Sequence, residues 1–241
     1  MRTISGLALC AVIGVVTAGQ ARAGMITLSA TDSGSYNSTG GHNSSDENYL
    51  AWSGWFEEHN RNFFTFDLRS LSETIVGATL RLETPPSGFS GSPATFSLYD
   101  VTTPVATLTT DHSGPAGQAI FADLGTGDFY GSIGIDGGLG FGTILSISLN
   151  AQAISDLNAA IGSDFAFGGA VSNGEASVFG GAGSASLRKL VLETSSTVTT
   201  TTPEPSSLAL FSIGAAMTGL GAARRRRRET QQQSEDTPQE A

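Results

Sequence analysis

Cysteine is almost absent from this chain of 241 residues: its one cysteine, Cys10, lies in an apolar segment close to the N-terminus. If that segment is removed during export, as its pattern below predicts, the remaining chain has no cysteine. Such a chain forms no disulfide, no thiolate nucleophile and no cysteine-based metal site. Its stability then has to come from packing.

Basic residues are also scarce in the middle of the chain. Between residues 24 and 202 there are 17 Asp and Glu against 5 Lys and Arg, a formal net charge of −12, compared with −10 for the whole chain. A surface this acidic repels nucleic acid and anionic membranes, so we expect no nucleic-acid partner. Neutral sugars and cations remain compatible with it.

The N-terminus has the layout of a secretory signal peptide. Arg2 supplies a positive start, residues 4–18 are largely apolar, and Ala21 and Ala23 form a small-residue cleavage site. These are the three regions of a cleaved export signal, and the apolar run is too short for a permanent membrane span. We therefore predict a signal peptide over residues 1–23, cleaved after Ala23.

The C-terminal part carries a second processing pattern. A Pro-Glu-Pro triplet precedes residues 206–223, which carry no charge and are about as long as a membrane helix must be. Five arginines follow, and they are favoured beside anionic headgroups on the cytoplasmic side. The residues of this pattern are Pro203, Glu204, Pro205, Arg224, Arg225, Arg226, Arg227 and Arg228. We predict a transmembrane helix that leaves the preceding domain outside the cytoplasm.

This order of triplet, apolar helix and arginine cluster resembles the PEP-CTERM sorting domain of Gram-negative bacteria, over residues 203–228. The resemblance implies recognition by an exosortase, a membrane-embedded enzyme with a catalytic cysteine. It also implies a precursor anchored in the inner membrane, processed near the motif and delivered to the cell surface or extracellular matrix. Members usually end soon after the arginines, whereas this chain continues with the polar residues 229–241, which we predict to be disordered.

Residues 24–193 contain a series of segments with the pattern of β-strands. Apolar and polar residues alternate with the period of two that is typical of antiparallel sheets with one wet face. The clearest segments are NFFTFDL (62–68), TIVGATLRLET (74–84), ATFSLYDV (94–101), TILSISLN (143–150) and KLVLET (189–194). In the second of these, Val76, Ala78, Leu80 and Leu82 are expected to share the buried face. With Gly- and Pro-rich turns between the segments, the pattern predicts an all-β fold, an antiparallel, jelly-roll-like β-sandwich.

One short helix is predicted over NAQAISDLNAAIG (150–162), where Ala153, Ile154, Leu157 and Ile161 form an apolar stripe and Gly162 follows. The Thr- and Ser-rich residues 194–202 read as a linker. The body over residues 48–194, with stretches such as NYLAW and RNFFTFDL, resembles an uncharacterised domain frequent in PEP-CTERM proteins. It is also similar to carbohydrate-binding-module-like sandwiches. These resemblances imply the fold and no established activity.

No catalytic arrangement stands out. His42, His59 and His112 lack the H-E-x-x-H spacing of a zinc protease, and there is no G-x-S-x-G elbow. Glu57 and Glu58 are adjacent, so on a strand they point to opposite faces and cannot act as a glycosidase pair. We therefore expect a protein that is not an enzyme.

Two kinds of binding site are hypotheses. Tyr49, Trp52 and Trp55 cluster in NYLAWSGWFEEHN and either stack on sugar rings or serve as core anchors. The loop carboxylates Asp32, Asp46, Asp123 and Asp128 offer the oxygen ligands that calcium takes, without EF-hand spacing, so they either hold a structural ion or are solvated turn residues. No other cofactor is expected.

Together these patterns predict an exported protein displayed at the cell surface, with a structural or interaction role in the envelope or biofilm matrix. Its expected partners are an exosortase, the membrane before processing, and polysaccharide. One alternative is a carbohydrate-binding module that uses Trp52 and Trp55. The second is a hydrolase of matrix polysaccharide.

Overall fold

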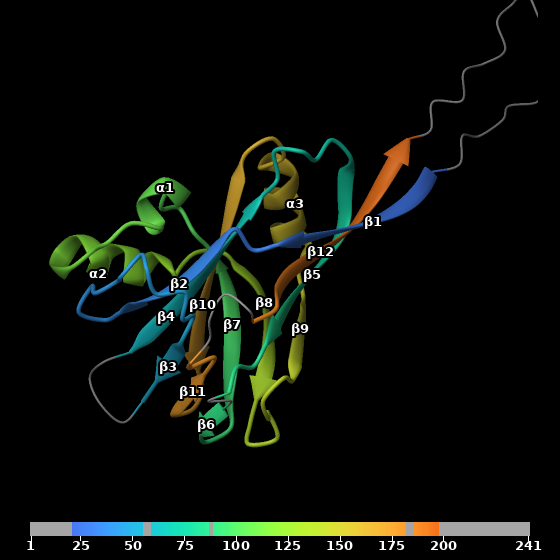
Figure 1. Cartoon of the computed structure of the whole chain (residues 1–241). Helices are drawn as coiled ribbons and strands as arrows, with labels where there is room; N and C mark the ends of the chain where they lie inside the picture. Colours follow the sequence, from blue (N-terminus) through green and yellow to red (C-terminus); the bar gives the residue numbers. More distant parts are fainter. Residues whose placement is uncertain (1–20, 55–58, 87–88, 182–185, 198–241) are drawn as a thin grey trace, which may run out of the picture. The chain divides into compact units, whose positions relative to one another are not determined.

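The predicted strand segments form two antiparallel sheets in the computed structural model, which describes residues 21–54, 59–86, 89–181 and 186–197 (Figure 1). Residues 1–20 of the predicted signal peptide, the sorting segment 203–228 and the tail 229–241 lie outside these residues. Ala21–Thr197 is one compact unit in which the two sheets make a sandwich-like body. The prediction of two antiparallel sheets packed as a sandwich is confirmed.

The first sheet joins the two ends of the body. Its strands, in spatial order, are β1 (Ala21–Ser29), β12 (Arg188–Thr197), β5 (Thr74–Glu83) and β9 (Ile144–Ser148). β1 pairs with β12 from Ala21 opposite Thr197 to Ser29 opposite Lys189, and Figure 1 shows the two strands side by side. Because β12 continues to Thr197, residues 194–197 of the predicted linker belong to this sheet.

The second sheet is larger. In spatial order it contains β6 (Phe89–Gly91), β11 (Ala176–Val178), β3 (Ala51–Ser53), β4 (Asn60–Asp67), β10 (Asp164–Ser172), β7 (Ala94–Asp100) and β8 (Phe129–Ile135). β2 (Asp32–Asn37) also pairs with β4. β2 and β10 pair with overlapping residues of β4, so they lie along its two opposite edges.

The main core fills the space between the sheets. Phe64 and Phe66 of β4 and Leu80 and Leu82 of β5 are fully buried there, together with Leu190 and Leu192 of β12. These are apolar positions expected from the period-two pattern. Burying a side chain of this size removes enough apolar surface from water to stabilise the fold by roughly 1.5–3 kcal/mol each.

The expected burial of Val76 is wrong, because β5 contains a bulge. Glu193 of β12 pairs with Gly77, but the next residue, Thr194, pairs with Ile75. Val76 is therefore an extra residue that interrupts the alternation. Ile75 turns into the core and is 2% exposed, whereas Val76 is 55% exposed. A bulge depends on the partner strand, so the sequence of β5 alone does not reveal it.

The predicted helix is present as α3 (Ala151–Ala159), which contacts β5 and β8. The side chain of Asn150 accepts a hydrogen bond from the backbone N–H of Ala153 at 3.0 Å, so it is an N-cap. Ala153 and Leu157 are buried, as the apolar stripe predicts.

The prediction of one helix is wrong, since the described chain also contains α1 (Val105–Leu108) and α2 (Gly114–Asp123). Both pack on the outer face of β2, β4 and β10 (Figure 1). They bury a second, smaller core, which consists of Tyr36, Phe63, Leu108, Ile120, Leu124 and Ala166. Gly114-Pro115 resembles a turn, but a proline in the first turn also suits a helix start, and here it begins α2.

The bulge leads to a test with two substitutions on one strand. Leu80→Ala should lower the free energy of unfolding by roughly 2–5 kcal/mol, because it leaves a cavity in the core. Val76→Ala should change it by no more than about 0.5 kcal/mol, because the side chain is exposed. Urea unfolding followed by circular dichroism measures both, and equal losses would contradict the bulge.

Candidate functional site

The residues predicted to direct sorting, Pro203 to Arg228, lie outside the described residues. The predicted cleavage residues Ala21 and Ala23 are in β1, opposite Thr197 and Ser195. Cleavage after Ala23 stays a prediction, and it would leave Gly24–Ser29 of that strand. Within residues 21–197, the described helices are all too short or too polar to cross a membrane.

The structure separates the three aromatic candidates. Tyr49 is fully buried, its hydroxyl donates to the Glu83 carbonyl oxygen at 2.8 Å, and its ring centroid lies 5.3 Å from that of Phe64. Tyr49 therefore belongs to the core and offers no face to a sugar. Trp52 on β3 is partly exposed, and Trp55 lies outside the described residues.

The four calcium candidates do not converge. In the described part of the chain, no three His, Cys, Asp or Glu side chains gather where they could hold a metal ion. Asp32 accepts a hydrogen bond from the backbone N–H of Ser33 at 2.7 Å, and Asp46 accepts one from that of Asn48 at 3.0 Å. Asp46 and Asp128 are exposed. Asp32, at the start of β2, and Asp46 thus each accept a hydrogen bond from the neighbouring backbone.

Asp123, the last residue of α2, ties the loop after β7 to that helix. Its carboxylate accepts hydrogen bonds from the backbone N–H and the hydroxyl of both Thr102 and Thr103, at 2.6–3.3 Å. Partial burial alone raises the pKa of Asp123, but these hydrogen bonds outweigh burial and lower it. The carboxylate is therefore a structural anchor for the loop.

Two histidines that are far apart in sequence meet in space. The backbone N–H of His42 donates to the His112 carbonyl oxygen at 3.0 Å, and the reverse bond measures 3.2 Å. The His42 ring stacks on Tyr36 with centroids 4.4 Å apart. Its Nδ1 lies 3.0 Å from the Ser35 carbonyl oxygen, and burial lowers its pKa. The pair fastens the loop after β2 to the loop between α1 and α2.

Two carboxylates approach each other at Tyr130. The buried hydroxyl of Tyr130 lies 3.1 Å from Asp100 Oδ1 and 2.8 Å from Asp156 Oδ2. Burial, with the hydrogen bonds and charges of both carboxylates, raises the pKa of Tyr130 well above its usual value. A glycosidase pair needs space for the sugar between its carboxyl groups, and here the tyrosine hydroxyl fills that space.

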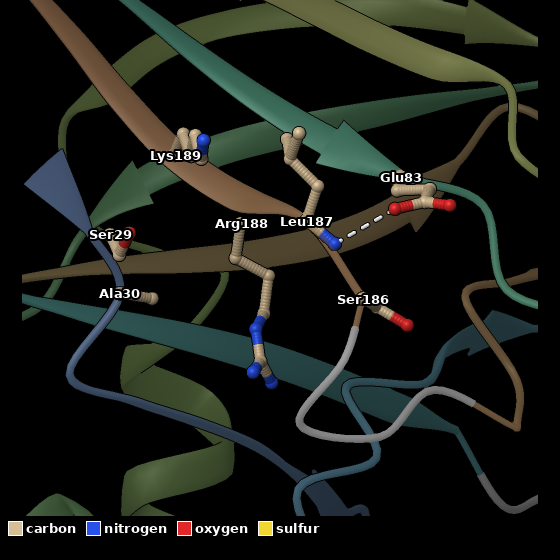
Figure 2. Close-up of a pocket in the computed structure, with 7 residues that line it drawn as sticks. All are labelled: Ser29, Ala30, Glu83, Ser186, Leu187, Arg188 and Lys189. Atoms are coloured by element: carbon tan, nitrogen blue, oxygen red, sulfur yellow. Dashed lines mark hydrogen bonds between the residues drawn. The ribbon is translucent and has the colours of Figure 1, made fainter. Parts of the chain in front are cut away.

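One cavity, of about 400 Å³, lies where β12 begins and where β1 and β5 end (Figure 2). It is lined by Ser29, Ala30, Glu83, Ser186, Leu187, Arg188 and Lys189. Glu83 accepts a hydrogen bond from the backbone N–H of Leu187 at 3.0 Å. The guanidinium of Arg188 donates to the Ser33 hydroxyl and lies 3.7 Å from Glu47. Glu83 and Arg188 are thus engaged within the fold.

A second cavity, of about 210 Å³, lies beside α2, and we call it the Trp52 pocket. Its lining comes from β3, β4, β10, α2 and the residue before β4: Trp52, Ser53, His59, Asn60, Arg61, Phe121, Ala170 and Val171. The Arg61 guanidinium lies over the Phe121 ring, 4.5 Å from its centroid. Its Nη1 donates to the carbonyl oxygens of Phe121 and Ala122, each at 2.9 Å.

Sequence reasoning found Trp52 but missed Arg61 and Phe121. The two are 60 positions apart and come together only because α2 packs on the outer face of β4. No spacing rule along the chain indicates such a contact. With aromatic rings, polar side chains and a cation around one cavity, the Trp52 pocket is the candidate binding site of the described body.

The hydrogen bonds of Asp123 lead to a pH-dependent prediction. Asp123→Asn should lower the free energy of unfolding by about 1–2 kcal/mol at pH 7, because an amide N–H₂ then faces hydrogen-bond donors. The pKa of Asp123 is lower in the folded protein than in the unfolded chain. The ionised carboxylate therefore stabilises the fold fully at pH values above the pKa of the unfolded chain. That stabilisation is lost as the pH falls through the pKa of the folded protein. The difference from wild type should therefore shrink below about pH 4.

Thermal unfolding between pH 3 and 7 measures this effect, with the exposed Asp128→Asn as control. A constant difference between Asp123→Asn and wild type across that range would contradict the role of the carboxylate.

Comparison with known proteins supports the C-terminal pattern. Residues 201–228 match the PEP-CTERM protein-sorting motif, which covers the Pro-Glu-Pro triplet, the apolar segment and the arginine cluster. No curated protein matches the chain, so the resemblance of the body stays a prediction. The motif implies an exported, cell-surface protein that an exosortase processes. The chain is therefore a β-rich protein that carries the PEP-CTERM protein-sorting motif at residues 201–228.

Proposed function

We propose that this protein is exported by its N-terminal signal and held in the inner membrane of a Gram-negative bacterium by residues 206–223. An exosortase then processes it and passes it to the cell surface or extracellular matrix. There its jelly-roll-like body has a structural or interaction role in the envelope or biofilm matrix and no catalytic one. The observation that carries this proposal is the sorting motif at residues 201–228.

The way the body ends suits display from its C-terminus. β12 runs to Thr197, and the matched motif begins at residue 201. β12 is an inner strand, hydrogen-bonded to β1 on one side and to β5 on the other, and Leu190 and Leu192 are buried. A domain that is tethered through an inner strand cannot release its tether without breaking two rows of hydrogen bonds.

Several histidine and aspartate side chains of the body make hydrogen bonds within the fold, which favours a non-catalytic role. The His42 imidazole contacts the backbone carbonyl oxygen of Ser35. Asp100 and Asp156 are joined through Tyr130, and Asp123 holds a loop. General acids and bases need access to a substrate, whereas these groups are engaged in holding the fold.

The sorting proposal is tested by changing the motif in the producing bacterium. Glu204→Ala, or deletion of Arg224–Arg228, should leave an unprocessed precursor in the membrane, because each removes a part of the signal that the exosortase is expected to read. Immunoblots of the membrane and released fractions over time measure processing. Glu229→Ala, just outside the matched residues, is the control. Maturation of the motif variants at the wild-type rate would show that the tail is an ordinary anchor.

A further inference from the structure

Arg61 is a partly buried cation in an acidic body. The body carries 17 acidic residues against 5 basic ones, and Arg69 and Arg188 both lie near carboxylates. Arg61 is half-buried, yet no carboxylate among the described residues lies within ion-pair distance of it. Its guanidinium lies over the Phe121 ring, bonds to two carbonyl oxygens and packs close to Gly125. Within the described part of the chain, this cation at a pocket wall therefore has no anionic partner.

The Arg61 guanidinium still has hydrogen-bonding capacity. It carries five N–H donors, of which those on Nη1 bond to the carbonyl oxygens at the end of α2. These carbonyls offset part of the positive charge, since the C-terminal end of a helix is partly negative. A partly buried cation remains costly without a counter-charge. A carboxylate in the pocket would supply that charge, and Arg binds carboxylates through paired hydrogen bonds.

The rest of the Trp52 pocket suits a small ring with hydroxyl groups. Trp52 and Phe121 provide aromatic surface, while Ser53, His59 and Asn60 provide polar groups. In the described part of the chain, no carboxylate lines the pocket. At about 210 Å³ the cavity lies below the roughly 300–1,000 Å³ of drug-sized sites, so it suits a single monosaccharide unit.

We infer that the Trp52 pocket binds one hexuronate residue of an acidic polysaccharide, with its ring against Trp52 and its carboxylate at Arg61. The net charge of −12 disfavours ligands with dense negative charge, because the whole surface repels them. A single carboxylate in direct contact with Arg61 is less affected, since charges farther than about 8 Å are largely screened at physiological salt. The pocket thus distinguishes a sugar acid from a neutral sugar by one ion pair.

This inference rests on the proposed function in one respect: the body must be exported to encounter polysaccharide outside the cell. The binding experiment uses the purified full chain in detergent and does not depend on processing. Failure of sorting and failure of binding are therefore separate results.

Isothermal titration calorimetry with methyl galacturonoside, which carries a single carboxylate, and with the neutral methyl galactoside tests the inference. The acidic sugar should bind at least about tenfold more tightly, as expected for a charge-assisted hydrogen-bonded pair. Arg61→Gln should remove that preference. The matched control Arg69→Gln removes an exposed arginine paired with Asp67 and Asp164, and it should leave affinity unchanged.

Because Arg61 also holds α2, a second variant keeps the test independent of folding. Trp52→Ala leaves Arg61 in place and should weaken binding of the acidic sugar at least about tenfold, because it removes the aromatic face against which the C–H groups of the sugar ring pack. Circular dichroism establishes that each variant is folded. Absence of binding by the wild type at millimolar sugar, or equal affinity for the acidic and neutral sugars, would overturn the inference.

Glu57 and Glu58 precede His59 in the sequence and lie outside the described residues. The double variant Glu57→Gln/Glu58→Gln tests whether a carboxylate of the chain itself is the partner of Arg61. Unchanged affinity for methyl galacturonoside supports a site for an external sugar. A rise of about tenfold or more would show that an internal carboxylate competes for Arg61, and would overturn the assignment.

Discussion

The pairing of β12 between β1 and β5 is the constraint on which the rest of the body depends. β12 is the last described strand, yet it occupies an inner position of the first sheet. That sheet is therefore incomplete until the whole body has been synthesised and β12 has paired with both β1 and β5. The same pairing sets the two ends of the body side by side, and along the sequence these ends continue into the predicted export signal and toward the sorting motif.

The second sheet explains why the body has a pocket. Its central strands β4 and β10 are covered on one face by the main core and on the other by α1 and α2. α2 covers only part of the outer face, and the Trp52 pocket lies where this cover ends. Arg61 belongs to β4, and its guanidinium donates hydrogen bonds to carbonyl oxygens of α2, so it links the strand to the helix at the edge of the pocket. The packing that buries Phe63 thus also sets the position of the cation.

Most other polar groups of the body serve the fold. Asp32 and Asp123, which offer suitable oxygens for calcium, accept hydrogen bonds from nearby backbone or hydroxyl groups. Tyr130 joins two carboxylates that would otherwise repel each other. Residues 21–197 contain no cysteine, so this body relies on such local hydrogen bonds and on packing to stabilise its loops. This use leaves Arg61 as a cation in a pocket, without a carboxylate partner among the described residues.

The sequence by itself determined the features that depend on local chemistry. The sorting motif, the apolar faces of β9 and β12, and the apolar stripe of α3 all follow from residue type and short-range spacing. Only the tertiary structure decided the bulge at Val76, the burial of Tyr49 and the contact of Arg61 with Phe121. Each of these depends on which distant segment lies alongside. A periodic pattern encodes the faces of a strand, but not the register or the neighbours against which those faces pack.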